Sequence, residues 1–182
     1  MKAVNYYFIL FLLCSLISTH SYAQQATGYG GWRSYYFLDE FGDLMYDKPF
    51  LETKVKNSKG HVLTIALTNR IDSGKDVVSL GISDGYSTMT LDRNASVSFK
   101  TSDGKVYRYS VPDSHLAGGQ IFLRNQKELS DIGVIFHKGD FKITISSHWA
   151  GDTYVSPNRT WTFNVTNQTK GFGNAYKKYL LR

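Results

Sequence analysis

Apolar and polar residues alternate along most of this 182-residue chain. Every second side chain is apolar in residues 61–69 and 141–146, and again around Val78, Val97 and Trp161. A period of two places the apolar side chains on one face of a strand, as in antiparallel sheets with one solvated face. Turn residues separate these runs, most clearly Asp103-Gly104, which predicts a hairpin. The pattern predicts an all-β antiparallel sandwich of nine or ten strands.

Two segments depart from the alternation. Residues 126–132 are polar with one apolar pair, which predicts a helical turn or loop before a strand that begins at Val134. Apolar residues in 171–182 fall at helical spacing, with Lys177, Lys178 and Arg182 on the other face or in the last turn. A helix this short is marginal alone, so we expect it to dock on the sandwich as a C-terminal cap.

The first 23 residues have the layout of a cleaved secretory signal. A short positive start precedes an apolar run over residues 6–17, and Ser21 and Ala23 provide the small residues before the cleavage point. The run is too short to span a membrane, which takes roughly 20 residues. We therefore expect a single mature domain, residues 24–182, that is exported to the bacterial periplasm, the cell surface or the medium and does not span a membrane.

The cysteine count and the charge distribution limit which ligands and partners the mature domain can have. The single cysteine, Cys14, lies in the leader, so the mature chain has no disulfide and no thiolate ligand. Losing Lys2 with the leader lowers the formal net charge from +6 to +5. The basic residues are scattered along the chain and not gathered on one stripe, which argues against a nucleic-acid partner. A weak attraction to anionic envelope polymers remains expected.

The order of several short segments resembles that of small exported bacterial β-sandwich domains, of the invasion-associated locus B type and of accessory proteins of type VI secretion. The segments are a strand led by Trp32, an acidic turn over residues 39–43, the runs 97–100 and 103–105, the run 138–143, and a strand that leads into residues 171–176. Those families commonly carry cysteines, which this mature chain lacks. The resemblance implies a non-enzymatic envelope protein and no functional residue.

The densest acidic group offers the best candidate for a metal site. Asp39, Glu40 and Asp43, with Asp47 nearby, bring carboxylate oxygens to an irregular loop, and such ligands suit calcium. Their spacing lacks the order of a dedicated calcium loop, and Asp43 beside Gly42 is explained equally well as a turn former. Calcium is therefore the one cofactor that we consider, and none is required.

Aromatic rings are the candidate ligand-binding residues, because flat rings on a rigid frame grip sugar faces and protein partners. Trp32 and Tyr35 belong to a segment with aromatic residues on both faces, and Trp149 and Tyr154 flank a turn at a predicted loop tip. The alternative for Tyr35 and for Phe37 is a second apolar sheet face that the C-terminal helix covers.

These observations favour a non-catalytic binding or accessory protein of the bacterial envelope, whose partner is a protein or a glycan. A carbohydrate-binding module is the first alternative, and a hydrolase acting on an extracellular polymer is the second. The chain has no G-x-S-x-G elbow, no phosphate-cradling glycine loop and no dinucleotide fingerprint.

Overall fold

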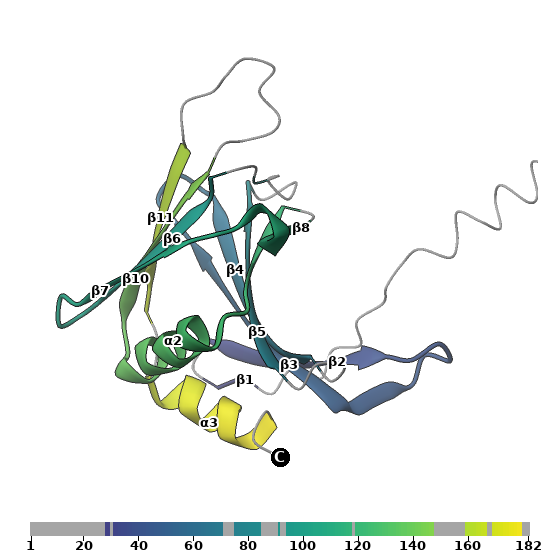
Figure 1. Ribbon diagram of the computed structural model, residues 1–182. Coiled ribbons are helices and arrows are strands. Elements are labelled where there is room, and N and C mark those ends of the chain that lie inside the picture. The colour runs from purple at the N-terminus through teal and green to yellow at the C-terminus, as the bar shows by residue number, and fades with distance from the viewer. Residues whose placement is uncertain are drawn as a thin grey trace, which may run out of the picture.

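The computed structural model describes residues 28–29, 31–70, 75–84, 91, 94–117, 119–147, 159–166 and 169–179. They form two antiparallel sheets, and helices α2 and α3 lie side by side at one end of the pair (Figure 1). The buried side chains of both sheets and both helices form one hydrophobic core. The predicted all-β sandwich with a C-terminal helix is confirmed.

The larger sheet has seven strands in the order β1-β2-β3-β4-β5-β9-β8. They are β1 (Gly28–Tyr29), β2 (Trp32–Leu38), β3 (Leu44–Lys56), β4 (Val62–Arg70), β5 (Lys75–Ser83), β9 (Gln120–Leu123) and β8 (Leu116–Ala117). A 3₁₀ turn, η1 (Asp113–His115), precedes β8. The smaller sheet has the order β11-β10-β6-β7, formed by β11 (Arg159–Val165), β10 (Phe141–Ser147), β6 (Ser96–Thr101) and β7 (Val106–Ser110). The described residues thus form eleven strands, whereas nine or ten were predicted. The prediction missed β1 and β8, which have two residues each and are too short to show an alternating pattern.

Alternation in sequence becomes burial on the inner faces of the sheets. In the larger sheet, Leu63, Ile65 and Leu67 of β4 lie opposite Ile82, Leu80 and Val78 of β5, and all six are buried. In the smaller sheet, the pairing of β10 with β6 and β11 buries matching rows of aliphatic and aromatic side chains. Burial of these side chains from water drives the two sheets together.

The predicted hairpin at Asp103-Gly104 joins β6 to β7. Gly104 has φ +85°, a left-handed conformation that glycine adopts without steric cost. Asp103 accepts hydrogen bonds from the Lys138 ammonium at 2.7 Å, from the Thr101 hydroxyl and from the backbone N–H of Lys105. These donors, with Lys138 first, hold the pKa of the Asp103 carboxyl well below its usual range.

Helix α2 (Gln126–Lys138) corrects the prediction of a turn followed by a strand at Val134. Asn125 caps the helix: its side chain accepts from the Lys127 N–H at 3.0 Å, and its own N–H donates to Glu128 at 3.3 Å. Gly139, at φ 115°, follows the last turn. The helix buries Ile132, Ile135 and Phe136 against the sheets, whereas Val134, the first residue of the predicted strand, is exposed.

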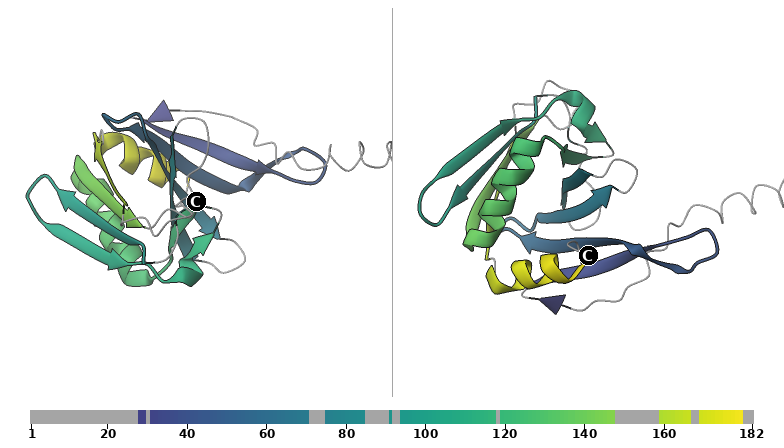
Figure 2. Two further views of the ribbon diagram at one scale, coloured as in Figure 1. Left: turned by 90° about the horizontal axis from the view of Figure 1, so that it is seen from above. Right: turned by 60° about the horizontal axis from the view of Figure 1, so that its bottom comes forward.

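Helix α3 (Thr169–Tyr179) is the predicted C-terminal cap, and it begins two residues earlier than expected. It lies along β2 and β3 and beside α2 (Figure 2). Phe172 and Ala175 are buried, and the Phe172 ring lies 5.0 Å from the Trp32 ring and 5.1 Å from the Phe136 ring, between ring centroids. These contacts show that the helix docks on the sandwich, as predicted.

The predicted leader, residues 1–23, lies outside the described residues. Within the part of the chain that the structure describes, no helix is both long enough and apolar enough to cross a membrane.

Candidate functional site

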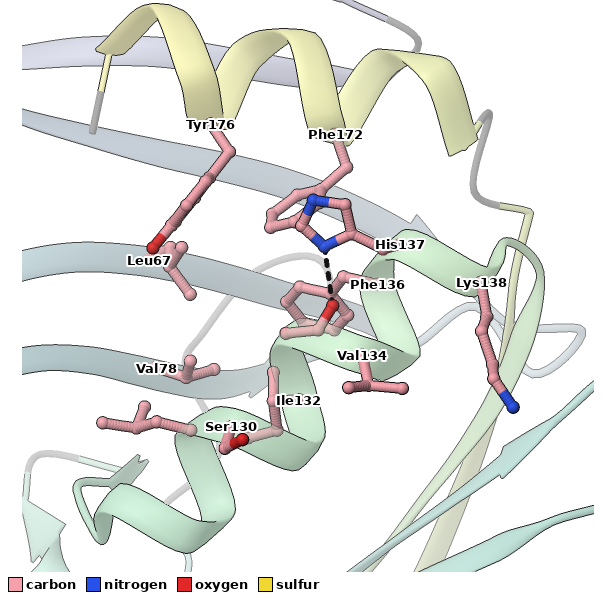
Figure 3. Close-up of a pocket in the computed structure, with 12 residues that line it drawn as sticks. Leu67, Val78, Ser130, Ile132, Val134, Phe136, His137, Lys138, Phe172 and Tyr176 are labelled. Carbon is pink, nitrogen blue, oxygen red and sulfur yellow. Dashed lines mark hydrogen bonds between the residues drawn. The ribbon is translucent and has the colours of Figure 1, made fainter. Parts of the chain in front are cut away.

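An apolar pocket of about 470 Å³ lies between α2 and α3, next to β4 and β5 (Figure 3). Leu67 and Val78, which are direct partners across these two strands, contribute aliphatic side chains. Helix α3 adds Phe172 and Tyr176; in Figure 3 the Phe172 ring lies beside His137 of α2, and Tyr176 points toward Leu67. The described lining is completed by residues of α2, namely Leu129, Ser130, Ile132, Gly133, Val134, Phe136, His137 and Lys138. A concave apolar site of this size with few polar groups is the usual form of a binding pocket.

Gly133 keeps one wall of the pocket free of a side chain. It lies in the interior of α2, and its φ is not in the left-handed region that favours glycine. A Cβ placed at this position would meet nothing within 4 Å. Glycine in a helix interior is less stable than alanine by roughly 0.5–1 kcal/mol. Neither backbone conformation nor crowding therefore explains this glycine, whereas an open pocket wall does.

His137 fixes the contact between the two helices. Its Nδ1 lies 2.7 Å from the carbonyl oxygen of Gly133, and since a carbonyl only accepts, Nδ1 donates here (Figure 3). The same ring packs edge-on against Phe172 at 5.0 Å and against Tyr176 at 6.2 Å. A Cβ on Gly173 of α3 would be in ordinary contact with this ring, at 3.8 Å. The imidazole is thus fixed to α2 by its hydrogen bond and packs against α3, which places α3 beside the pocket.

The rim of the pocket is partly apolar and partly charged. Val134 is 46% exposed, which makes it one of the exposed large apolar residues of the described chain. Lys138 is bonded to Asp103, and this hydrogen bond is the main cause that raises the pKa of Lys138. The described lining residues include no carboxylate. The site therefore offers apolar area with a polar border, and no acid–base pair made of a carboxylate and a histidine.

Helix α2 is also fastened to the smaller sheet away from the pocket. The Tyr109 hydroxyl of β7 donates to Asp131 Oδ2 at 3.1 Å. Burial, followed by this hydrogen bond, raises the pKa of Tyr109 well above its ordinary value of 10.0. Together with the Lys138–Asp103 ion pair, this bond fixes α2 to the hairpin of β6 and β7.

The structure corrects the prediction that Trp32 is a surface ligand residue. Its side chain is 1% exposed and packs against Phe136 and Phe172 in the core. Tyr35 points to the other face of β2, where its half-buried ring stacks on Phe50 at 5.1 Å. Because α3 covers the Trp32 face, the alternative in which the C-terminal helix covers the Tyr35 face is also wrong. The physical reason is that the helix completes the core between the sheets.

The other predicted ligand residues, Trp149 and Tyr154, lie outside the described residues. Asp39, Glu40 and Asp43 form the turn between β2 and β3. Asp39 Oδ1 accepts from the backbone N–H groups of Phe41 and Asp43, each at 2.9 Å. This carboxylate therefore stabilises the turn. The described part of the chain contains no group of three histidine, cysteine or acidic residues that could hold a metal ion. Calcium binding at this turn stays a prediction.

The geometry defines an all-β sandwich with two packed helices at one end and an apolar pocket between them. Its fold is similar to the crystal structure of invasion associated protein B from Bartonella henselae, with a TM-score of 0.50 and 15% sequence identity. The similarity covers 87% of this chain and 97% of that chain. No protein-family model and no curated protein matches the chain. At this identity the likeness shows the fold, and it confirms the resemblance to the invasion-associated locus B type as a resemblance of fold.

Proposed function

We propose that this protein is an exported, non-catalytic binding or accessory protein of the bacterial envelope, and that the pocket between α2 and α3 receives an apolar side chain of a partner protein. Gly133 carries the proposal: it leaves the pocket wall open at the expense of helix stability, with no conformational need for glycine. Export is supported by the leader pattern of residues 1–23. The fold likeness to a bacterial protein described as invasion associated agrees with an accessory role.

The shape of the site favours an anchor from a protein. Protein interfaces place one or a few large apolar side chains in a central pocket and surround them with polar residues that exclude water. Here the apolar lining continues onto exposed Val134, while Ser130, His137 and Lys138 border it. The apolar rim gives a partner additional contact area beyond the pocket itself.

Non-catalytic binding is supported by the chemistry of the lining. Hydrolysis of a polymer requires a nucleophile or a water activated by a positioned base. Ser130 and His137 are the candidates for such roles in this lining, and the Nδ1 of His137 is already bonded to the Gly133 carbonyl. No described lining residue is a carboxylate that would orient this histidine. Hydrolysis of an extracellular polymer thus remains the weaker alternative.

Site-directed photo-crosslinking tests the proposal. A photoreactive amino acid replaces Val134 at the rim, and a matched one replaces Val106, which is 38% exposed on β7. We expect a defined protein adduct from position 134 that position 106 does not give. The adduct should disappear when Gly133→Leu fills the pocket, and circular dichroism should show that this variant is folded. The same adduct from both positions, or an adduct that survives Gly133→Leu, would reject the pocket as the site.

A further inference from the structure

Twelve side chains cover the outer face of the four-stranded sheet, and strand pairing arranges them in three rows of four. The first row contains Val106, Lys100, Lys142 and Asn164; the second contains Arg108, Ser98, Thr144 and Thr162; the third contains Ser110, Ser96, Ser146 and Thr160. All twelve are exposed or half-buried. Seven carry hydroxyl groups, three carry positive charge and none is acidic. The face is therefore an array of mainly hydrogen-bonding groups with a positive charge.

The hydroxyl groups pair with one another across the strands. Thr144 Oγ1 lies 3.3 Å from Thr162 Oγ1, and Ser146 Oγ lies 3.0 Å from Thr160 Oγ1. A hydroxyl has one donor and two acceptor sites, so each pair keeps free capacity toward a ligand. Such groups match the hydroxyls of a sugar chain lying on the sheet.

The cations lie close together, and none of the other nine side chains of this face is acidic. Lys100 and Lys142 are direct cross-strand partners, an arrangement that is destabilising for like charges. Arg108 belongs to the adjacent row, about 7 Å along the strand direction. The structure shows no ion pair for these three side chains among the residues it describes. An anionic group bound between the two lysines would relieve their repulsion.

A shallow hollow of about 290 Å³ lies at the first row, beside Lys100, Lys142 and Asn164. Asp140 is the acidic member of its lining, and the other described members are Thr101, Ser102, Phe141, Val165 and Thr166. The hollow thus combines two ammonium groups and one carboxylate with amide and hydroxyl groups. The two lysines outnumber Asp140, so the hollow keeps a positive charge that favours a sugar carrying both hydroxyl groups and a carboxylate.

We infer that the outer face of the four-stranded sheet binds a linear polysaccharide that carries carboxylate groups, a polyuronate. The rows of hydroxyls contact the sugar hydroxyls, and Lys100, Lys142 and Arg108 contact the carboxylates. None of the twelve side chains is aromatic, so the face has no ring on which bases would stack, and a single-stranded nucleic acid is disfavoured. This site is separate from the pocket and does not depend on the function proposed for it.

Binding of alginate, a polyuronate, to the purified mature protein tests the inference by isothermal titration calorimetry. The double variant Lys100→Gln/Lys142→Gln removes two charges from the face, and Lys56→Gln/Lys59→Gln removes two exposed charges elsewhere. We expect the first variant to weaken alginate binding by roughly tenfold or more, because it removes charge-assisted hydrogen bonds. The control should change affinity little. Thr144→Val/Thr162→Val should also weaken binding although the charge is unchanged, and neutral dextran should bind weakly.

Three results would overturn the inference. Absence of alginate binding to the unaltered protein rejects it outright. Equal losses in the two lysine variants would mean that overall charge and not this face attracts the polymer. Binding of single-stranded oligothymidylate with equal affinity, lost in Lys100→Gln/Lys142→Gln, would assign the face to nucleic acid. Thermal unfolding of each variant, followed by circular dichroism, separates a loss of binding from a loss of fold.

Discussion

Gly133 lies in the interior of α2 at the wall of the pocket, and replacing it by alanine tests the main structural argument. Its backbone has no left-handed φ, and an added Cβ has open space around it. Alanine is more stable than glycine in a helix interior, because glycine loses more backbone freedom on folding. Gly133→Ala is therefore expected to raise the free energy of unfolding by about 0.5–1 kcal/mol.

Gly104, at the tip of the hairpin of β6 and β7, provides the matched control. A Cβ on this residue also meets nothing within 4 Å, but its φ is +85°. A left-handed conformation costs an ordinary residue about 1–2 kcal/mol. Gly104→Ala should therefore lower stability, so two glycines with equal space should respond with opposite signs.

Urea unfolding of the three proteins, followed by circular dichroism, measures these differences. Thermal unfolding provides a second measurement, because for a domain of this size 1 kcal/mol corresponds to a shift of the melting temperature of about 2–4 °C. A destabilised Gly133→Ala variant would show that the fold itself requires glycine at position 133, and would refute the argument that the open pocket wall explains this residue. It would also remove the observation that carries the proposed function. A stabilised variant would show that the fold does not require glycine at position 133, as the role in the pocket wall implies.

Three further predictions concern the remaining contacts. Tyr109→Phe removes the hydrogen bond to Asp131 and should lower the free energy of unfolding by about 0.5–1.5 kcal/mol. Because the pKa of Tyr109 is raised in the folded state, the contribution of its hydroxyl to the free energy of unfolding is present below pH 10.0 and is lost as pH rises further. Urea unfolding at a series of alkaline pH values should therefore show a weaker pH dependence in Tyr109→Phe. Because the pKa of Asp103 is lowered in the folded state, the contribution of its carboxylate to the free energy of unfolding is present above the ordinary pKa of 3.8 and is lost as pH falls. Urea unfolding at a series of acidic pH values should therefore show a smaller loss of stability in Asp103→Asn. Trp32→Ala should cost about 3–5 kcal/mol in thermal or urea unfolding, as for a core ring, and a loss below 1 kcal/mol would contradict its burial.

Local sequence signals predicted the sheets well because each depends on a few neighbouring residues. A period of two specified which side chains of β4, β10 and β11 face the core, and Asp103-Gly104 specified the hairpin of β6 and β7. The C-terminal helix was also predictable, since Phe172, Ala175 and Tyr176 share one face. Two-residue strands such as β1 and β8 carry no such pattern and were missed.

Helix α2 was missed although the sequence contained its signals. Asn125 and Glu128 have the spacing of a capping box, and Leu129, Ile132 and Phe136 recur at helical intervals. The polar start and the apolar run from Val134 to Phe136 resembled a loop followed by a strand. Recognition of the capping box would have resolved the choice, because it marks the first turn of a helix.

The burial of Trp32 and the pocket were beyond any local signal. A segment with aromatic residues on both faces does not reveal which face a distant helix covers. That choice depends on the docking of α3, which follows Trp32 by more than a hundred residues. The pocket likewise exists because side chains of α2, α3, β4 and β5 meet, and none of these segments is adjacent in sequence to all the others.

Helix α2 contacts the smaller sheet, the larger sheet and α3, so a group bound beside it bears on all three. Its bonds to Tyr109 and Asp103 hold it to the smaller sheet, whereas Phe136 packs on Trp32 of the larger sheet and on Phe172 of α3. A group bound in the pocket contacts α2, α3 and the larger sheet together. Binding to the folded state alone stabilises that state, by about 2.7 kcal/mol at a ligand concentration one hundred times the Kd. A partner that occupies this pocket would therefore stabilise the packing of α2 and α3 against the larger sheet through non-covalent contacts alone.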